Sequence, residues 1–327
     1  MLTYTRCRHV AQQGIYILYY LGVDGGGTKT AFVLLDLQLN VLATHETGTC
    51  YYIEVGMDGS KVILESGVRA LLKKVNSSVE DITFAFFGLP AFGEDSKLLS
   101  EMKALPSGFM SPEKYHCDND MVNGWAAAFG GNDGINIVAG TGSIAFGARD
   151  KITMRCGGWG EIFSDEGSAY WIGCKGLQLF TKMSDGRCEK GPLYQLLKSY
   201  FELEHDLDIT AIVLSEWQAE RSKIASVSVL VCEAATVGDQ YAQDIFNEAA
   251  EELACIVESV RHSLGYTENE CVDVSYSGGV FRAGELIMKP FINALGSYSN
   301  YRLHAPLYSP AVGAAMYAAK LYGMPLK

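Results

Sequence analysis

The sequence predicts an α/β protein made of two domains that have similar architecture and share a cleft. The 327 residues are about twice the length of a typical single domain. A strand, a glycine-rich turn and a second strand occur twice, and each copy begins a stretch in which strands and helices alternate. No linker rich in Pro or Ser separates the two stretches. We therefore place the boundary near residue 122, with domains at 15–122 and 123–327.

The first half of the chain is expected to form one sheet with helices on its faces. Runs rich in apolar and β-branched residues predict strands at 15–23, 31–37, 41–47, 82–89 and 115–118. The run at 82–89 is continuously apolar, which is typical of a strand covered on both faces. Apolar residues at helical spacing predict a helix over 59–75, and a run of small residues predicts another over 121–129.

The second half repeats the opening pattern and then becomes mainly helical. Strands are predicted at 134–139 and 144–148, on either side of a glycine turn at 140–143, and a later strand is predicted at 271–276. Apolar periodicity predicts helices at 166–183, 227–237, 240–265 and 310–322. The identity between the two halves is too low to show a repeat by sequence alone.

Composition excludes several classes of function. A formal net charge of −12 argues against nucleic acid as the main partner, because proteins that bind it carry basic patches. The apolar run at 15–23 is shorter than the roughly 20 residues that cross a bilayer, so we expect no membrane partner. The nine cysteines form no CxxC pair and no zinc-type spacing, which indicates reduced thiols in a cytoplasmic enzyme. Residues 1–14 are interpreted as a loose extension.

The first glycine turn is a candidate phosphate-binding loop. Three consecutive glycines allow positive φ and bring backbone N–H groups close to an anion, and a lysine adds positive charge. The aspartate before the turn can hold Mg²⁺ through water. The alternative is a tight hairpin in which the glycines serve only geometry, and the spacing matches neither the P-loop nor the Rossmann pattern. The candidates are Asp24 for the metal and Gly25, Gly26, Gly27, Thr28 and Lys29 for the phosphates.

Two later turns extend the candidate nucleotide site. Backbone amides and hydroxyls of the second turn can reach phosphate oxygens, and the paired turns then lie on either side of a triphosphate. A third turn follows the strand at 271–276 and allows a flat adenine ring to lie against the backbone, although a plain loop before a helix is an equally good interpretation. The residues are Gly140, Thr141, Gly142 and Ser143 in the second turn and Gly278 and Gly279 in the third.

Asp120 is the candidate general base. It follows the strand at 115–118 and precedes a helix, where it can take a proton from an attacking hydroxyl, as aspartates do in other phosphoryl-transfer enzymes. The alternative is a simple helix N-cap, which is a common use of Asp. Asp118 is the second choice because it lies further from the end of the strand.

The segment 156–171 is the most unusual part of the sequence. Glycines, among them Gly158, surround Trp159, and an acidic helix start follows. This pattern predicts a pocket wall whose carboxylates bind sugar-like hydroxyls. The alternative is that Asp165 caps the helix and Glu166 complements its dipole, and the two interpretations are compatible.

Four segments resemble the BadF/BadG/BcrA/BcrD-type ATPase family and, within it, the N-acetylglucosamine kinases. They read LGVDGGGTKT, NDM after a strand, VAGTGSIAFG and CGGWGEIFSDEGSAYW, and the similarity runs from about Tyr20 to the C-terminal helix. The resemblance implies an actin-like ATPase fold with two ribonuclease-H-like domains and with ATP and Mg²⁺ in the cleft. It also implies transfer of the γ-phosphoryl group to a hydroxyl of an amino sugar.

The resemblance also assigns roles to single residues. The matches are Asp120 with the catalytic aspartate, Gly25 to Thr28 with the first phosphate loop, Thr141 and Gly142 with the second, and Cys156 and Asp165 with sugar-contacting positions. The chain departs from the kinases at Tyr51 and Tyr52, where they tend to carry an asparagine that grips the sugar. It also departs at 88–93, where GLPAFG replaces a turn rich in Ser and Gly. These departures leave the phosphotransfer residues intact and the identity of the acceptor open.

The leading hypothesis is a kinase for N-acetylglucosamine or a close relative such as N-acetylmuramic acid or glucosamine. The alternative is an ATPase activator of a 2-hydroxyacyl-CoA dehydratase or benzoyl-CoA reductase. Such activators ligate an iron–sulfur cluster at a dimer interface, and the sequence has no cluster-binding segment. A sugar sensor gated by ATP is a third hypothesis, disfavoured by the candidate base. We expect a cytoplasmic homodimer whose partner is a small-molecule sugar.

Overall fold

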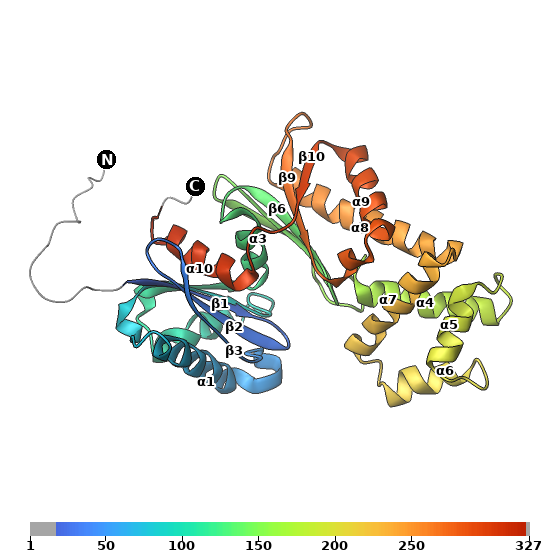
Figure 1. Cartoon of the computed structure of the whole chain (residues 1–327), viewed down its shortest axis with the longest axis horizontal. Coiled ribbons are helices and arrows are strands. Elements are labelled where there is room, and N and C mark those ends of the chain that lie inside the picture. The colour runs from blue at the N-terminus through green and yellow to red at the C-terminus, as the bar shows by residue number, and fades with distance from the viewer. Residues whose placement is uncertain (1–17, 325–327) are drawn as a thin grey trace, which may run out of the picture.

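Two β-sheets, each covered by helices, lie in two lobes of the molecule (Figure 1). The computed structural model describes residues 18–324. The α/β class predicted from the sequence is confirmed. The expected extension at 1–14 and the first residues of the strand predicted at 15–23 lie outside the described residues.

The first sheet has the strand order β3-β2-β1-β4-β5. β1 pairs with β2, and β2 with β3, in antiparallel fashion, whereas β1, β4 and β5 run parallel. All five strands predicted for the first half are present, with small shifts at their ends. They are β1 (Tyr19–Gly25), β2 (Lys29–Leu35), β3 (Val41–Gly48), β4 (Ile82–Leu89) and β5 (Tyr115–Asn119).

The second sheet has the equivalent order, β10-β9-β6-β7-β8. β6, β7 and β8 are antiparallel, and β9 and β10 add to β6 in parallel, so the prediction of two units of similar architecture is confirmed. The strands are β6 (Gly134–Ala139), β7 (Ser143–Arg149), β8 (Ile152–Gly157), β9 (Val272–Ser277) and β10 (Tyr301–His304). β8 and β10 were not predicted, because these two edge strands bury few side chains and show little apolar alternation.

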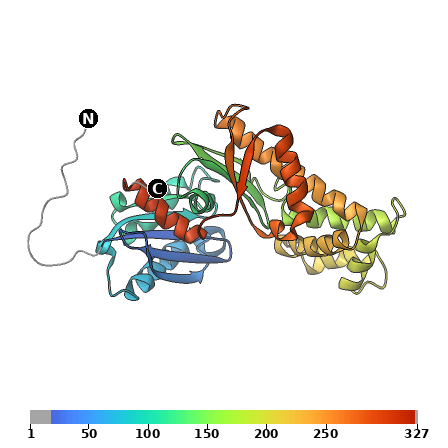
Figure 2. The same cartoon turned by 45° about the horizontal axis from the view of Figure 1, so that its top comes forward.

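Helices α1 and α10 cover opposite faces of the first sheet (Figures 1 and 2). Leu21 and Val23 of β1 pack toward α1, whereas Tyr20 belongs to the cluster under α3 and α10. The helices of this lobe are α1 (Tyr52–Lys73), α2 (Leu99–Lys103), α3 (Met121–Phe129) and α10 (Pro310–Leu321), with short 3-10 turns η1 (Val79–Asp81), η2 (Leu105–Gly108) and η3 (Pro112–Lys114).

The C-terminal helix α10 packs on the first sheet, although the predicted second domain, 123–327, contains it. Its approach to β1 is close, because a Cβ at Gly22 would lie only 2.2 Å from the backbone nitrogen of Ala315. The chain therefore enters the second lobe after α3 and returns after β10. The predicted domain boundary near residue 122 concerns only the first crossing, from the first lobe to the second, and it stays a prediction.

The second lobe is rich in helices that pack on one large core. Its helices are α4 (Ala169–Ser184), α5 (Pro192–Tyr200), α6 (Asp208–Ala211), which continues into a π-helical turn η4 (Ile212–Glu216), α7 (Arg221–Thr236), α8 (Gln240–Ser263), the 3-10 turn η5 (Gly279–Ala283) and α9 (Glu285–Tyr298). α5 was not predicted because it is short, and α9 because Pro290 interrupts its pattern. α1 begins at Tyr52 rather than at 59, with a break at Gly56, whose φ is 72°.

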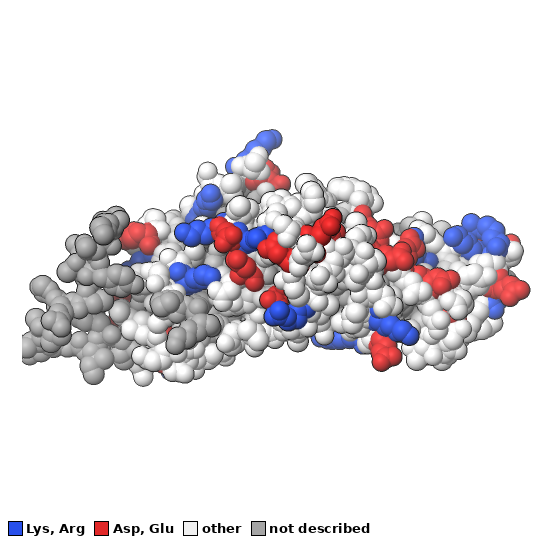
Figure 3. Space-filling model, turned by 90° about the horizontal axis from the view of Figure 1, so that it is seen from above, with Lys and Arg blue, Asp and Glu red and all other residues white. Residues whose placement is uncertain are grey.

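Lys and Arg intermingle with Asp and Glu on the upper face of the molecule, with no continuous basic band (Figure 3). Among residues 18–324, no helix is both long enough and apolar enough to cross a membrane. The eight cysteines of the described part are all free thiols, as the sequence predicts.

Candidate active site

Two hydrogen bonds made by Gly26 hold the first glycine turn. The Gly26 N–H donates to the carbonyl of Lys29 at 2.9 Å, and the Thr49 hydroxyl donates to the carbonyl of Gly26 at 2.7 Å. The three glycines allow positive φ, but none of Gly25, Gly26 and Gly27 has it. Gly25 is needed for space instead, because a Cβ there would lie 2.7 Å from the Sγ atom of Cys50.

The charged residues beside this turn differ in their surroundings. Lys29 is exposed, and its Nζ atom lies 2.6 Å from Oε1 of Glu46 on β3. Asp24 is mostly buried, and Asn123 of α3 donates from Nδ2 to its Oδ1 at 2.7 Å. Burial raises the pKa of the Asp24 carboxyl, while Asn123 and Lys29 oppose that rise. Thr28, at the tip of the turn, is exposed.

Asn123 is a site residue that the sequence reasoning missed. A Cβ at Gly88 of β4 would lie 2.1 Å from its Nδ2, so the amide reaches Asp24 only because β4 carries glycine there. Gly88 belongs to the segment 88–93, which departs from the kinase pattern. The sequence offered one signal for this residue: Asn123 is the single amide in a predicted helix of apolar and small residues. The structure shows that this amide is fully buried.

Asp120 stands at the start of α3 but does not cap it. Its side chain accepts no capping hydrogen bond, and the Oδ1 atom of Asn119 accepts from the Met121 N–H at 3.1 Å instead. Burial raises the pKa of the Asp120 carboxyl to about 7, with further contributions from the negative charges of Asp24 and Glu94. A carboxylate that titrates near neutral pH is well matched to proton transfer.

Asp118, the second choice, has a different environment. It is half-buried, its Oδ1 accepts from the Asn119 N–H at 2.7 Å, and its Oδ2 lies 3.9 Å from Nε2 of His116. Asp120, by contrast, is electrostatically coupled to Asp24.

The second glycine turn is tied to the start of α4. The Gly140 N–H donates to the carbonyl of Gly142 at 2.9 Å, and the Ala169 N–H donates to the carbonyl of Gly140 at 2.8 Å. The buried Ser143 hydroxyl donates to the carbonyl of Glu166 at 2.6 Å, whereas Thr141 is exposed. Thr141 is therefore the hydroxyl of this turn that is available to a ligand.

Asp165 pairs with an arginine that the sequence reasoning did not find. Its Oδ2 atom lies 2.5 Å from Nη2 of Arg221, the first residue of α7, and only 2% of the side chain is exposed. The expectation that Asp165 caps a helix beginning at 166 is wrong, because α4 begins at Ala169 and the Ser168 hydroxyl accepts from the Trp171 N–H. The pKa of Asp165 is raised by burial and lowered by Arg221.

The other residues predicted to contact a sugar come from both lobes. Tyr51 and Tyr52 begin α1, half-buried, with ring centroids 6.1 Å apart in an edge-to-face arrangement. Burial raises the pKa of both hydroxyls. Cys156 is half-buried near the end of β8. Gly158 has φ 69°, and a Cβ there would lie 2.7 Å from Ile144, so both conformation and space require glycine.

The third glycine turn borders a mainly apolar cavity of about 590 Å³. Gly278 has φ 108° and packs against the backbone of Ala139, immediately before the second turn. Gly279 lines the cavity, which we call the base cavity. Its walls come from the start of α4, from α7, α8 and η5, and include Ile172, Val229, Cys232, Thr236 and Val280.

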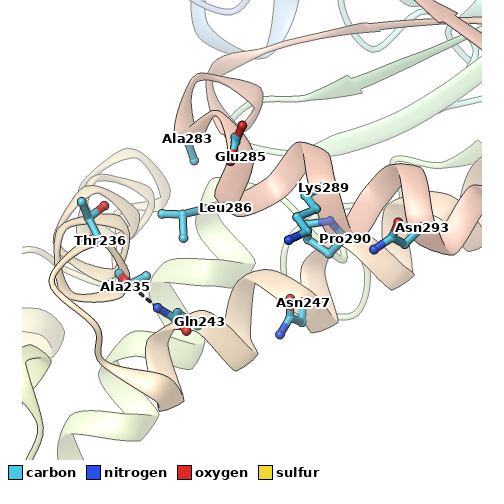
Figure 4. Close-up of a pocket in the computed structure, with 10 residues that line it drawn as sticks. All are labelled: Ala235, Thr236, Gln243, Asn247, Ala283, Glu285, Leu286, Lys289, Pro290 and Asn293. Atoms are coloured by element: carbon cyan, nitrogen blue, oxygen red, sulfur yellow. Dashed lines mark hydrogen bonds between the residues drawn. The ribbon is translucent and has the colours of Figure 1, made fainter.

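A second cavity of about 630 Å³ adjoins the base cavity, and Thr236 and Ala283 line both. Figure 4 shows most of its polar side chains coming from the two helices α8 and α9, among them Gln243 and Lys289, while Thr236 comes from the end of α7. Gln243 is fixed by donation from Nε2 to the carbonyl of Ala235 at 2.9 Å. The second lobe thus offers an apolar wall and, beside it, hydrogen-bonding groups.

The two equivalent sheets, each opening on a glycine turn, define an actin-like ATPase fold of two ribonuclease-H-like units. The chain belongs to the BadF/BadG/BcrA/BcrD ATPase family, whose model matches residues 21–318. The family resemblance and the fold class predicted from the sequence are confirmed.

Three comparisons support this assignment. The chain is 30% identical over 311 residues to an N-acetyl-D-glucosamine kinase of Dictyostelium discoideum, covering 91% of this chain and 97% of that protein. It is 28% identical over 305 residues to an N-acetylmuramic acid/N-acetylglucosamine kinase of Clostridium acetobutylicum, covering 92% and 98%. A solved structure from Chromobacterium violaceum, 24% identical, superposes with a TM-score of 0.71 and covers 92% of this chain and 99% of its own.

Proposed function

We propose that the protein is an ATP-dependent sugar kinase that transfers the γ-phosphoryl group to a hydroxyl of an amino sugar. The observation that carries the proposal is Asp120, an uncapped carboxylate with its pKa raised to about 7, beside the first glycine turn. The similarity to N-acetylglucosamine kinases over nine-tenths of the chain supports the same reaction class.

In this proposal Asp120 accepts the proton of the attacking hydroxyl. The first turn and the second turn hold the triphosphate with backbone N–H groups, and the exposed hydroxyls of Thr28 and Thr141 add donors. The adenine lies in the base cavity against Gly278 and Gly279, where the apolar walls remove a flat ring from water. Acceleration comes mainly from positioning and charge stabilisation, as in other phosphoryl transfers.

Mg²⁺ fits the residues beside the first turn, and Asp24 is the residue that we propose would hold it. Asn123 occupies one oxygen of the carboxylate. Mg²⁺ commonly binds through one or two carboxylates, water and substrate phosphates rather than through a protein cage. Residues 18–324 contain no group of three or more potential ligands, which agrees with that mode. When bound, the ion would neutralise phosphate charge.

N-acetylglucosamine is the acceptor that we propose first. Tyr51 and Tyr52 in the first lobe and Cys156, Gly158 and Asp165 in the second are the proposed substrate contacts. Asp165 is almost completely covered by Arg221 and its neighbours, so its contact with a sugar requires that pair to adjust. The carboxylates of Asp24, Glu94 and Asp120 make the first lobe's side of the site negative. A neutral sugar is therefore favoured over N-acetylmuramic acid, whose carboxylate would add like charge.

A coupled assay of ADP release with Mg-ATP tests the proposal. The panel contains N-acetylglucosamine, N-acetylmuramic acid, glucosamine, N-acetylmannosamine and glucose. We expect sugar-dependent release that is fastest with N-acetylglucosamine. No sugar-dependent ADP with any hexosamine would overturn the proposal, whereas a preference for N-acetylmuramic acid would overturn only the argument from charge.

The protein is further proposed to work in the cytoplasm as a homodimer. The predicted domains 15–122 and 123–327 stay a proposal for its division, with α10 of the second range packed on the first sheet. Light scattering of the purified chain tests the dimer. A monomeric mass at micromolar concentration would contradict it without affecting the proposed reaction.

A further inference from the structure

Arg221 is a cation that lies against the second glycine turn. Two carboxylates orient its guanidinium group. Nη2 lies 2.5 Å from Oδ2 of Asp165, and Nε lies 3.4 Å from Oε2 of Glu161. Asp165 is 2% exposed and Glu161 is half-buried. These two carboxylates therefore orient the Nε and Nη2 edge of the guanidinium group.

The same group contacts Gly142. A Cβ at Gly142 would lie 2.4 Å from Nη2 of Arg221 and 2.6 Å from Oδ2 of Asp165, so only glycine lets the turn approach the pair this closely. Gly142 has no positive φ, and the need for glycine here is therefore one of space. The ion pair and the candidate phosphate turn form one packed unit.

Arg221 is also partly open to solvent. Its side chain is 42% exposed, and its charge reaches tyrosines of both lobes. Burial raises the pKa of Tyr51 and of Tyr170, and the positive charge of Arg221 partly offsets both rises. Tyr51 belongs to the first lobe and Tyr170 to the second, so the charge of Arg221 acts on groups of both lobes.

Arg221 retains donors for a ligand. A guanidinium group carries five N–H donors, and no hydrogen bond or ion pair within residues 18–324 involves Nη1 of Arg221. Lys29, the other cation beside the turns, is paired with Glu46 at 2.6 Å on an exposed surface. A phosphate bound to the second turn would therefore lie within reach of the guanidinium group of Arg221.

Arg221 also begins the helix that lines the base cavity. Ser228, two turns along α7, is a cavity residue, and about 10 Å of helix axis separates the two positions. A nucleotide whose base lies in the cavity can thus extend its phosphates along α7 toward the guanidinium group.

We propose that Arg221 contacts the phosphoryl group that is transferred and stabilises its charge, with Asp165 and Glu161 as positioning residues for the guanidinium group. This inference rests on the proposed function. Arg221 forms no covalent bond and moves no proton in it. The guanidinium group stays charged and supplies donors where negative charge develops.

The test compares binding of ADP and of AMPPNP, both with Mg²⁺, to the full chain by calorimetry. Arg221→Met should weaken AMPPNP binding at least about tenfold and ADP binding less than about threefold, because only AMPPNP carries the γ-phosphoryl position. Its kcat should fall by roughly 10²- to 10³-fold, the usual effect of losing one such donor. Arg221→Lys should restore part of the AMPPNP affinity.

Lys223→Met is the matched control. Lys223 lies two residues along α7, is similarly exposed at 43%, and pairs only with Glu220 within the described residues, at 3.1 Å. It should leave both affinities and kcat unchanged. Equal weakening of ADP and AMPPNP by Arg221→Met, or a rise in KM for the sugar alone, would overturn the inference while leaving the kinase proposal in place. Failure of the unmodified protein to bind either nucleotide would overturn the kinase proposal itself.

Discussion

At the scale of single residues, the site depends on carboxylates that burial makes less acidic. The pKa of Asp120 reaches about 7 mainly because of burial, and the negative charge of Asp24 adds to that rise. Burial also raises the pKa of Asp24. An ordinary surface aspartate, with a pKa near 3.9, would be a much weaker base. The buried position of Asp120 between β5 and α3 therefore raises the basicity of its carboxylate.

Asp120→Asn should abolish phosphoryl transfer and spare nucleotide binding. The amide keeps the size of the side chain but cannot accept the proton, so kcat should fall by roughly 10²- to 10⁴-fold. Steady-state kinetics measure the loss, and calorimetry with AMPPNP checks that binding changes less than about threefold. Asp118→Asn is the control and should stay close to wild type. Retention of more than about a hundredth of kcat would reject the general-base role of Asp120.

Glu94→Gln should move the acidic limb of the pH profile. Asp120 must be ionised to act, so kcat/KM should rise with pH through about 7 in the free enzyme. Glu94 helps to raise that pKa, and its neutralisation should shift the limb to lower pH, by less than about one unit. Glu101→Gln, on the neighbouring helix α2, should leave the limb in place. An unmoved limb in Glu94→Gln would contradict the electrostatic coupling.

Some of these residues could be found by sequence reasoning and others could not. Asp24, Asp120 and the glycine turns stand next to strand ends, where local patterns indicate ligand sites. Arg221 and Asp165 are 56 residues apart, in a polar stretch and a glycine-rich segment, and nothing local predicts that they meet. Their pairing depends on how α7 packs beside the second turn.

At the scale of elements, the sequence predicted central strands and long helices but not the edges of the second sheet. β4 and β6 are almost completely buried, so their apolar runs are unambiguous. β8 and β10 are edge strands with half-exposed side chains, which have no such pattern. The packing of α10 on the first sheet was also missed, because helical periodicity does not identify the sheet that a helix covers.

Gly313→Ala should destabilise the first lobe. A Cβ at Gly313 of α10 would lie 2.3 Å from the backbone nitrogen of Ala127 in α3, and a backbone atom cannot rotate away. Overpacking of this kind costs roughly 1–3 kcal/mol. The control is Gly296→Ala in α9, where a Cβ has no neighbour within 4 Å and helix propensity favours alanine by up to about 1 kcal/mol. Denaturant unfolding compares the two, and equal stabilities would contradict the close packing of α10 on α3.

At the scale of the whole molecule, the chemical groups are divided between the lobes. The first lobe carries Asp24, Asp120 and Glu94, and the second carries the base cavity and Arg221. In the proposed mechanism neither lobe holds a complete set, so we expect the lobes to close on the substrates. Closure would also exclude the water that otherwise hydrolyses ATP.

This division predicts that closure needs both ligands. The Asp120→Asn variant is suited to the measurement because it should bind ATP and sugar without turnover. We expect its radius of gyration, measured by X-ray scattering, to fall only partly with Mg-ATP alone, because the proposed sugar contacts in the two lobes are then unfilled, and to fall further when N-acetylglucosamine is added. Hinge closures of this kind move backbone by more than about 2 Å. Full compaction with Mg-ATP alone would show that the nucleotide bridges the lobes by itself, and would contradict a role for the sugar in completing the site.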